Sequence, residues 1–366
     1  MKKLTIFMLI LICLCLAVPK INTVYATDGN KDEMFVVYTS DGEKLFERSD
    51  VKVNDNYITK NFEMYEVVSV DENNKTAKAE FVKTLKKPNV SVNPNPSQIS
   101  LTDKKICLYL THNDESYVPT DGYDSIYGAG GIHDVAKALK NSFELLGINT
   151  TLNETLHIPH NSSAYSRSEV TAKELLKTNP DALFDIHRDG VSRQYYVTEV
   201  DGKERCKVRI VVGQANPNKE QNLEFALYLM SVAENMYPWL FADIYYASGH
   251  YNQALYNKML LFEMGTYLVE KEMVFDSVHP LAEVINTALY NTTVDSGTGD
   301  ITIGGNDDPE DPTINDHFNN LQNKTNKRTV ISLIIIGVSV VVVAVASVLL
   351  VIKTKDKPKK SKSNKK

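Results

Sequence analysis

Residues 182–190 read Ala-Leu-Phe-Asp-Ile-His-Arg-Asp-Gly, an apolar run that ends in polar residues. Residues 108–115 (LYLTHNDE) and 260–265 (LLFEMG) follow the same pattern. Each run predicts a buried strand whose end carries a histidine or a carboxylate. In open α/β sheets, sites form at the carboxyl ends of the strands. The three runs therefore predict that four side chains meet at one edge of a sheet: His112, Glu115, His187 and Glu263.

Two imidazoles and two carboxylates are the groups that a catalytic zinc site needs, with three protein ligands, an open position for water and a general base. Glu263 follows four apolar residues, and burying an unpaired carboxylate is so costly that it has to meet a cation or take up a proton. A polar surface loop is the alternative interpretation of His112 and Glu115. For His187 the alternative is a hydrogen-bonded core histidine.

Other histidines compete for a place in this site. His133 follows a glycine run at residues 128–131 and could be a ligand or a residue in the first turn of a helix. The glycine run lacks the Lys-Ser/Thr of a phosphate-binding loop, so we interpret it as a flexible loop over the site. His157 and His160 lie on a predicted loop that either lines the cleft or is solvated. The absence of a Gly-x-Ser-x-Gly motif argues against serine hydrolysis.

Residues 104–291 alternate between short apolar strands and amphipathic helices. Apolar residues recur at helical spacing from Ile132 to Leu146, and Gly147 then predicts the end of that helix. Further helices are expected at residues 168–178, 219–237 and 280–290. This order predicts an α/β fold with a mostly parallel sheet flanked by helices.

Residues 27–97 have a different character, because they are rich in strand and turn signals. Two strand pairs flank turn-forming residues: 35–39 with 44–47, and 64–70 with 76–82. A proline-rich linker follows at residues 86–96. We therefore expect a small N-terminal β-rich domain at residues 27–97, distinct from the domain at 104–291.

The two ends of the chain predict attachment to a membrane. Residues 1–26 combine lysines, an apolar run and a small-residue cleavage site, which is typical of a signal peptide, with an uncleaved anchor as the alternative. Residues 292–328 are poor in large apolar residues and predict a flexible tether. The 23 uncharged residues 330–352 predict a transmembrane helix, and the lysine-rich tail 353–366 should stay in the cytoplasm. The expected localisation is a single-pass protein of the cell membrane with an extracytoplasmic catalytic domain.

The composition of the chain indicates whether it binds nucleic acid and whether disulfides hold its fold together. The chain carries a formal net charge of -6, and outside its lysine tail it has no basic patch interleaved with aromatic residues. This argues against nucleic acid as a partner. Removal of the signal peptide would leave Cys107 and Cys206, and two cysteines do not make a disulfide framework.

Several short motifs occur in one order, at residues 111–117, 165–168, 185–190, 211–213, 251–253 and 261–265. The set resembles the stage II sporulation protein P family, whose members are related to zinc N-acetylmuramoyl-L-alanine amidases. The resemblance spans about residues 104–291. It implies a zinc amidase-like fold and a peptidoglycan hydrolase that cleaves the amide between N-acetylmuramic acid and L-alanine. It further implies a role in septum thinning and engulfment during sporulation.

The resemblance also implies roles for individual residues and for partners. By position, His112 and His187 would be zinc (Zn²⁺) ligands with Glu115 as the third, and Glu263 would be the catalytic carboxylate. Partners would be peptidoglycan, a stage II sporulation protein D-like lytic transglycosylase and a protein M-like membrane protein. Two guanidinium groups could bind the carboxylates of the stem peptide or form structural salt bridges: those of Arg188 and Arg167.

Two departures from the family pattern keep other functions open: the residue at the first strand end, and the predicted membrane anchor, which is C-terminal here and usually N-terminal in the family. Leu110 stands where the family usually has the first histidine of a His-Thr-His motif. A catalytically silent wall-binding or scaffold protein is therefore one alternative. A zinc endopeptidase that acts on wall cross-links is another, because it would share the metal site and differ only in the cleft.

Overall fold

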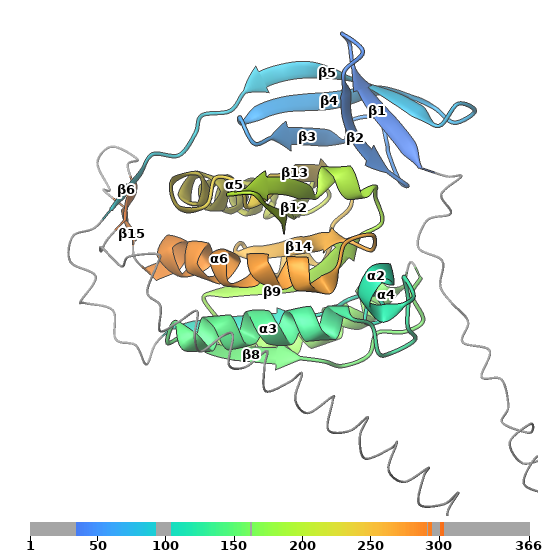
Figure 1. The fold of residues 1–366 in the computed structure, drawn as a ribbon. Coiled ribbons are helices and arrows are strands. Elements are labelled where there is room, and N and C mark those ends of the chain that lie inside the picture. The colour runs from blue at the N-terminus through green and yellow to red at the C-terminus, as the bar shows by residue number, and fades with distance from the viewer. Residues whose placement is uncertain (1–33, 93–103, 162, 291, 295–300, 304–366) are drawn as a thin grey trace, which may run out of the picture. The chain divides into compact units, whose positions relative to one another are not determined.

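Eleven strands form one sheet in a computed structural model of the chain, which describes residues 34–92, 104–161, 163–290, 292–294 and 301–303 (Figure 1). In chain order the strands are β1 (Phe35–Thr39), β2 (Lys44–Arg48), β3 (Asn56–Thr59), β4 (Glu63–Asp71), β5 (Thr76–Thr84), β7 (Lys105–Tyr109), β8 (Asn149–Asn153), β9 (Ala182–Asp189), β12 (Val208–Gly213), β13 (Phe241–Ala247) and β14 (Met259–Thr266). Their order across the sheet is β2-β1-β5-β4-β3-β13-β12-β14-β9-β7-β8.

Helices cover both faces of the strands β7 to β14. The helices are α2 (Val118–Asp121), α3 (Ile132–Leu145), α4 (Ala164–Leu176), α5 (Lys219–Met236) and α6 (Lys271–Tyr290), with short 3₁₀ turns at Arg193–Tyr195 and Gln253–Leu255. The first face packs α3, α5 and α6 against strand residues such as Phe184 and Ile210, which makes the largest core (Figure 1). On the second face, Ala172 and Leu175 of α4 pack on Cys107 and Leu183.

Strands β9 and β14 and helix α3 form where the sequence predicts them. All eight residues of β9 and of β14 are buried, which explains their nearly continuous apolar runs. Helix α3 ends as predicted, because Gly147 takes a φ of +74° and its N–H donates to Glu144 O at 3.1 Å. The N–H of Ile148 donates to Phe143 O at 3.0 Å, which completes a Schellman cap.

The N-terminal strands continue the sheet. Strand β3 pairs antiparallel with β13, and both predicted hairpins are present, as β1–β2 and β4–β5. A second apolar cluster joins Phe46 of β2 to Val211, Tyr245 and Leu261 of the central strands. The Phe46 ring also stacks on Tyr57 at 4.7 Å between centroids. These contacts fold β1 and β2 over the second face of the central strands.

The predicted fold class was therefore wrong in the type of its sheet. Five of the ten neighbouring strand pairs are antiparallel, so the sheet is mixed and larger than expected. Hydrophobic patterning marks strands but not their direction, and the free edge of β13 accepts β3 in antiparallel register. The β-rich segment thus extends this sheet, while the domain boundaries at 27–97 and 104–291 stay predictions.

The fold class also included a C-terminal transmembrane helix, and the localisation was expected to be single-pass in the cell membrane. Both expectations are corrected: among the helices that the structure describes, none is long and apolar enough to cross a bilayer. The longest of these, α6, has twenty residues but contains Lys271, Glu272 and Glu283. The signal peptide at 1–26, the span at 330–352 and the tail at 353–366 lie outside the described residues.

Two small sheets complete the described part of the chain. Strands β10 (Val197–Val200) and β11 (Lys203–Cys206) form an antiparallel hairpin. Strand β16 (Ile301–Ile303) pairs with β15 (Thr292–Val294) and β6 (Val90–Val92). Strands β15 and β16 are the described part of the predicted tether at 292–328.

Candidate metal centre

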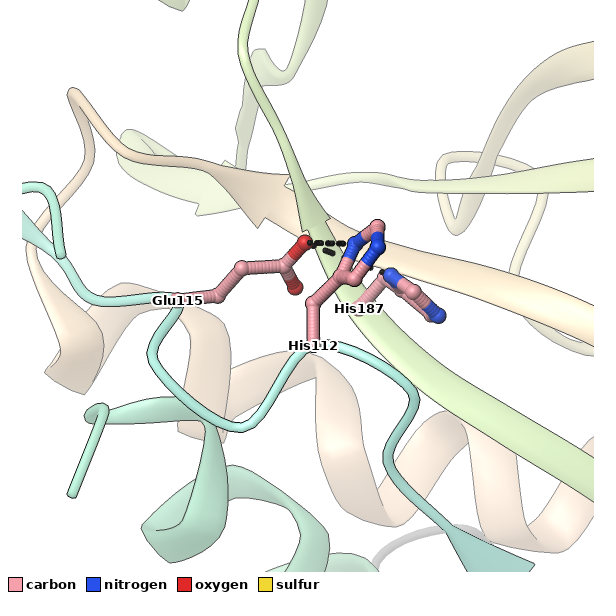
Figure 2. Close-up of side chains that lie close together, drawn as sticks. All are labelled: His112, Glu115 and His187. Carbon is pink, nitrogen blue, oxygen red and sulfur yellow. Dashed lines mark hydrogen bonds and ion pairs between the residues drawn. The ribbon is translucent and has the colours of Figure 1, made fainter. Parts of the chain in front are cut away.

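His112, Glu115 and His187 come together at the carboxyl ends of two parallel strands (Figure 2). His112 and Glu115 lie on the loop that leaves β7, and His187 lies near the end of β9. Glu115 Oε1 is 3.0 Å from His112 Nδ1 and 3.2 Å from His187 Nδ1. The structure thus brings together the three residues for which the sequence predicted metal binding.

Main-chain contacts hold the Glu115 carboxylate in place. The N–H of Arg188 donates to Glu115 Oε2 at 2.9 Å, which leaves Oε1 facing the imidazoles. Gly130 packs directly against the loop, because a Cβ there would lie 2.2 Å from Glu115 O. The N–H groups of Gly130 and Ile132 donate to Asn113 O and Glu115 O. The glycine run, interpreted above as a flexible loop, therefore packs closely against the loop that carries His112 and Glu115.

The donor set fits a zinc ion. One ligand atom from each of the three residues lies within 4.8 Å of the others. In tetrahedral zinc sites with bonds of about 2.0–2.1 Å, ligand atoms lie roughly 3.3 Å apart, close to the two distances at Glu115. Within the described residues, His187 Nε2 is buried without a hydrogen-bond partner, although it lies 3.0 Å from Asp185 Oδ1. Imidazole and carboxylate donors are those that zinc takes in catalytic sites.

Electrostatics keep the Glu115 carboxylate charged. Burial alone would raise the pKa of Glu115, but the neighbouring His187 and His112 outweigh it and hold this pKa well below its usual range. Burial opposes the charge on His187 as well, yet Asp185 and Glu115 raise the pKa of His187 well above its usual value. Burial dominates at His112 and lowers its pKa. A negative Oε1 is thus available to a cation.

Aromatic rings line one side of the centre. His160 stacks on His112 at 3.7 Å between ring centroids, and His160 Nδ1 lies 3.0 Å from Asp114 Oδ1. Tyr165 contacts the rings of His112 and His187 at 5.5 and 6.3 Å. His160 therefore lines the cleft, whereas His157 is buried between Leu110 O and Thr171 Oγ1. His133 lies outside the trio, with its Nδ1 2.9 Å from Glu154 Oε1.

Glu263 lies beside the trio on β14. It pairs in register with His187 across the parallel strands β14 and β9. Only 6% of Glu263 is exposed, and its Oε2 has no hydrogen-bond partner in the part of the chain that is described. Burial, followed by the charge of Asp189, raises the pKa of Glu263 to about 8, although His187 and Arg48 partly oppose the shift. A carboxyl group with this pKa can both accept and release a proton near neutral pH.

A bulge in β14 follows Glu263 directly. The pairing of β14 with β9 shifts register between Glu263 and Thr266, and Gly265 takes a φ of +79°. A Cβ at Gly265 would lie 2.7 Å from Cys206 Sγ. Bulges of this kind redirect neighbouring side chains and are frequent beside active sites.

The trio and Glu263 open into one pocket of about 120 Å³. Arg188 also lines this pocket, but its guanidinium donates to two main-chain carbonyls, Ser116 O at 3.1 Å and Asp124 O at 2.7 Å. Arg167 lies outside the residues that line the pocket and donates to His157 O, Pro159 O and Asn161 Oδ1. Substrate binding by either arginine stays a prediction.

Sequence reasoning missed the buried charges behind the pocket. Asp189 accepts from Arg209 Nη1 at 2.6 Å and from Tyr196 OH at 2.8 Å, and Arg209 is fully buried. The alternation of Asp185, His187 and Asp189 places all three on one face of β9, and this signal could have revealed Asp189. Arg48, the last residue of β2, also lines the pocket, and no local pattern around it predicts this.

Comparison with known proteins places this centre in a family context. A model of the stage II sporulation protein P (SpoIIP) family matches residues 28–286, which is 259 of the 366 residues. The stage II sporulation protein P of Bacillus subtilis strain 168 is 29% identical over 189 residues, covering 46% of this chain and 47% of that protein. The chain thus spans about half the length of the curated relative that it matches.

Two solved structures resemble part of the chain. The CwlD amidase of Clostridioides difficile, in complex with the GerS lipoprotein, is 14% identical with a TM-score of 0.37, and covers 51% of this chain and 96% of that chain. The N-acetylmuramyl-L-alanine amidase Ami1 of Mycobacterium abscessus is 13% identical with a TM-score of 0.33, covering 50% and 95%. Both TM-scores are low, so the family match carries more weight than either structure.

Proposed function

Since the chain belongs to the stage II sporulation protein P family, we propose that it is a peptidoglycan hydrolase that acts in sporulation. The reaction we propose is cleavage of the amide between N-acetylmuramic acid and L-alanine. The observation that carries the proposal is the grouping of His112, Glu115 and His187 beside Glu263 in one pocket. This set supplies three ligands for a metal and one further carboxylate for proton transfer.

Zinc is the cofactor that these residues would hold, and when bound it would acidify a water molecule and polarise the amide carbonyl. His112, Glu115 and His187 would be its ligands. The hydrogen bond from the main-chain N–H of Arg188 to Glu115 Oε2 would keep Oε1 turned towards the ion. Such outer contacts orient ligands and tune the affinity for the metal.

Glu263 would carry the proton during the reaction. Its unpartnered Oε2 would take a proton from the attacking water as the carbon–oxygen bond forms. The same oxygen would return that proton to the alanine nitrogen as the carbon–nitrogen bond breaks, leaving a free amine and a lactyl carboxylic acid, which releases its proton to solvent. The raised pKa of Glu263 suits both transfers, because a general acid–base group works best near the operating pH.

The test uses the full-length chain on a defined muropeptide, with zinc content measured in parallel. We expect a free lactyl group as product, one zinc per chain, and a loss of about 10²- to 10⁴-fold in kcat for Glu263→Gln with zinc retained. Glu80→Gln is the matched control, because Glu80 is an exposed carboxylate on β5. A new peptide end would instead indicate an endopeptidase, and wall binding without cleavage would indicate a silent scaffold protein.

The sporulation partners are part of the same proposal. A stage II sporulation protein D-like transglycosylase and a protein M-like membrane protein would act beside this chain on the same wall. Co-purification of the full-length chain with each partner tests the assembly, and recovery of neither partner would contradict it.

A further inference from the structure

Arg48 reaches the pocket from the edge strand β2. Its Nη1 lies 3.6 Å from Asp189 Oδ1 and 4.0 Å from Glu263 Oε1. Both distances allow charge attraction but exceed those of N–H···O hydrogen bonds. The guanidinium also lies 4.4 Å from the centre of the Tyr245 ring, and only 17% of the side chain is exposed. Arg48 is therefore held in the pocket by packing and charge.

The pocket thus contains a donor and an acceptor that the described residues leave without partners. These atoms are Arg48 Nη1 and Glu263 Oε2, both buried. A buried polar atom without a hydrogen bond is costly, so such atoms in a pocket point to a ligand that pairs with them. Glu263 Oε2 is assigned above to the proton of the attacking water. Arg48 Nη1 has no role in that chemistry.

Asp189 does not need Arg48 as its partner. Asp189 Oδ2 accepts from Arg209 Nη1 at 2.6 Å and from Tyr196 OH at 2.8 Å, and Oδ1 accepts from the N–H of Gly190 at 2.8 Å. Three short hydrogen bonds already satisfy this carboxylate. Arg48 Nη1 is therefore the donor in the pocket that has no hydrogen-bond partner among the described residues.

The guanidiniums of Arg188 and Arg167, the other two candidates for carboxylate binding, already donate hydrogen bonds within the protein. Arg188 donates to the carbonyls of Ser116 and Asp124, and Arg167 donates to those of His157 and Pro159. These hydrogen bonds fix both guanidiniums in place, and Arg167 also lies outside the residues that line the pocket. A carboxylate in the pocket would reach Arg48 Nη1 without displacing a hydrogen bond made by any of the described residues.

We propose that Arg48 is a specificity residue that binds a carboxylate of the stem peptide close to the scissile amide. This inference rests on the proposed function, which makes the substrate a muramoyl peptide. Guanidinium–carboxylate hydrogen bonds are strong because both partners are charged. The nearest candidate carboxylate is that of the D-glutamate that follows L-alanine. The N-terminal strands would thereby complete the substrate site, although they precede every residue of the catalytic group.

The test measures binding of two muropeptides to the full-length chain in a Glu263→Gln background. One muropeptide carries the free D-glutamate carboxylate and the other carries the carboxamide. The Glu263→Gln chain with native Arg48, here called the parent, should bind the muropeptide with the free carboxylate about 10- to 100-fold more tightly than the one with the carboxamide. Arg48→Met should abolish this preference, and Arg48→Lys should keep part of it because the charge remains. Arg193→Met is the matched control, since Arg193 pairs with Glu204 on the surface.

Equal binding of both muropeptides by the parent would overturn the proposal, and that outcome does not depend on the folding of any variant. Unchanged discrimination in a folded Arg48→Met variant would overturn it as well. Cleavage by the chain with native Glu263 is measured separately. A wild-type chain that discriminates between the ligands but cleaves neither would contradict the proposed function while supporting Arg48 as the carboxylate-binding residue.

Discussion

Glu263 lies directly opposite His187 on the neighbouring parallel strand, and both side chains face the same pocket. Strand pairing therefore sets the distance between the proposed general base and His187, whereas the other two proposed ligands, His112 and Glu115, lie on the loop after β7. Sites built on paired strands hold their geometry better than sites built on loops.

Zinc should stabilise the folded chain through His187. At a free zinc concentration a hundredfold above the dissociation constant, the free energy of unfolding should rise by about 2.7 kcal/mol. His187→Ala removes a proposed ligand and should abolish most of this gain, measured as the shift in Tm between zinc and a chelator. His250→Ala should keep the gain, because His250 is exposed outside the trio. An equal shift in His187→Ala would argue against this ligand set.

The stability of the metal-free chain should fall with rising pH because of Glu263. Its folded-state pKa of about 8 lies above its ordinary value of 4.5, so the folded chain binds the proton more tightly than the unfolded chain. The contribution is fully present below about pH 4.5 and is lost as pH rises towards 8. Each pKa unit corresponds to about 1.4 kcal/mol, so the total is a few kcal/mol.

Denaturant unfolding between pH 4.5 and 8.5, in the presence of a chelator, measures this dependence. Glu263→Gln cannot ionise and should give a flatter profile than the wild type over this range. Identical pH profiles for the two proteins would show that Glu263 titrates in the folded chain as it does in the unfolded chain.

Arg209 should be essential to folding rather than to chemistry. Its guanidinium joins Asp189 to Asp243 at 2.6 and 2.5 Å, and it is fully buried. Arg209→Met leaves Asp243 without its cation and Asp189 with Arg48 alone at 3.6 Å, which should cost about 3–5 kcal/mol of unfolding free energy. Arg193→Met removes a surface ion pair and should cost less than about 1 kcal/mol. Equal losses of unfolding free energy in the two variants would mean that the buried ion pairs of Arg209 add little to stability.

Gly265 should be required both for stability and for activity. Gly265→Ala strains a positive φ and also brings a methyl group to within 2.7 Å of Cys206 Sγ. Gly42 has a similar φ of +84° but no neighbouring atom within 4 Å, so Gly42→Ala isolates the cost of the backbone strain. Gly265→Ala should be less stable than Gly42→Ala by about 1–3 kcal/mol. Gly265→Ala should also lower kcat, because the bulge directly follows Glu263. Equal stability and equal activity of Gly265→Ala and Gly42→Ala would contradict this prediction.

Much of the α/β part could be predicted because its signals are local. Strands β9 and β14, helix α3 with its glycine cap, and the two N-terminal hairpins follow from apolar spacing and turn residues. The trio and Glu263 were predictable because each follows an apolar run, and parallel strands bring their carboxyl ends together. Their chemical roles stay proposals until metal content and activity are measured.

The direction of the strands and the full extent of the sheet could not be predicted in this way. Strand β14 runs parallel to β9 but antiparallel to β12, and no feature within β14 itself distinguishes these partners. The predicted parallel sheet was wrong because an apolar run is compatible with both kinds of ladder.

The amino-acid sequence by itself determined strands β9 and β14, helix α3 and the two N-terminal hairpins, and which polar groups stand at the strand ends. These properties depend on the spacing of side chains along a few neighbouring turns or pleats. Only the tertiary structure decided that β2 folds over the central strands and brings Arg48 next to Asp189 and Glu263. Of these partners, Glu263 lies more than two hundred positions from Arg48 along the chain. Their contact depends on how the apolar faces of whole strands pack, a property that no local stretch of sequence contains.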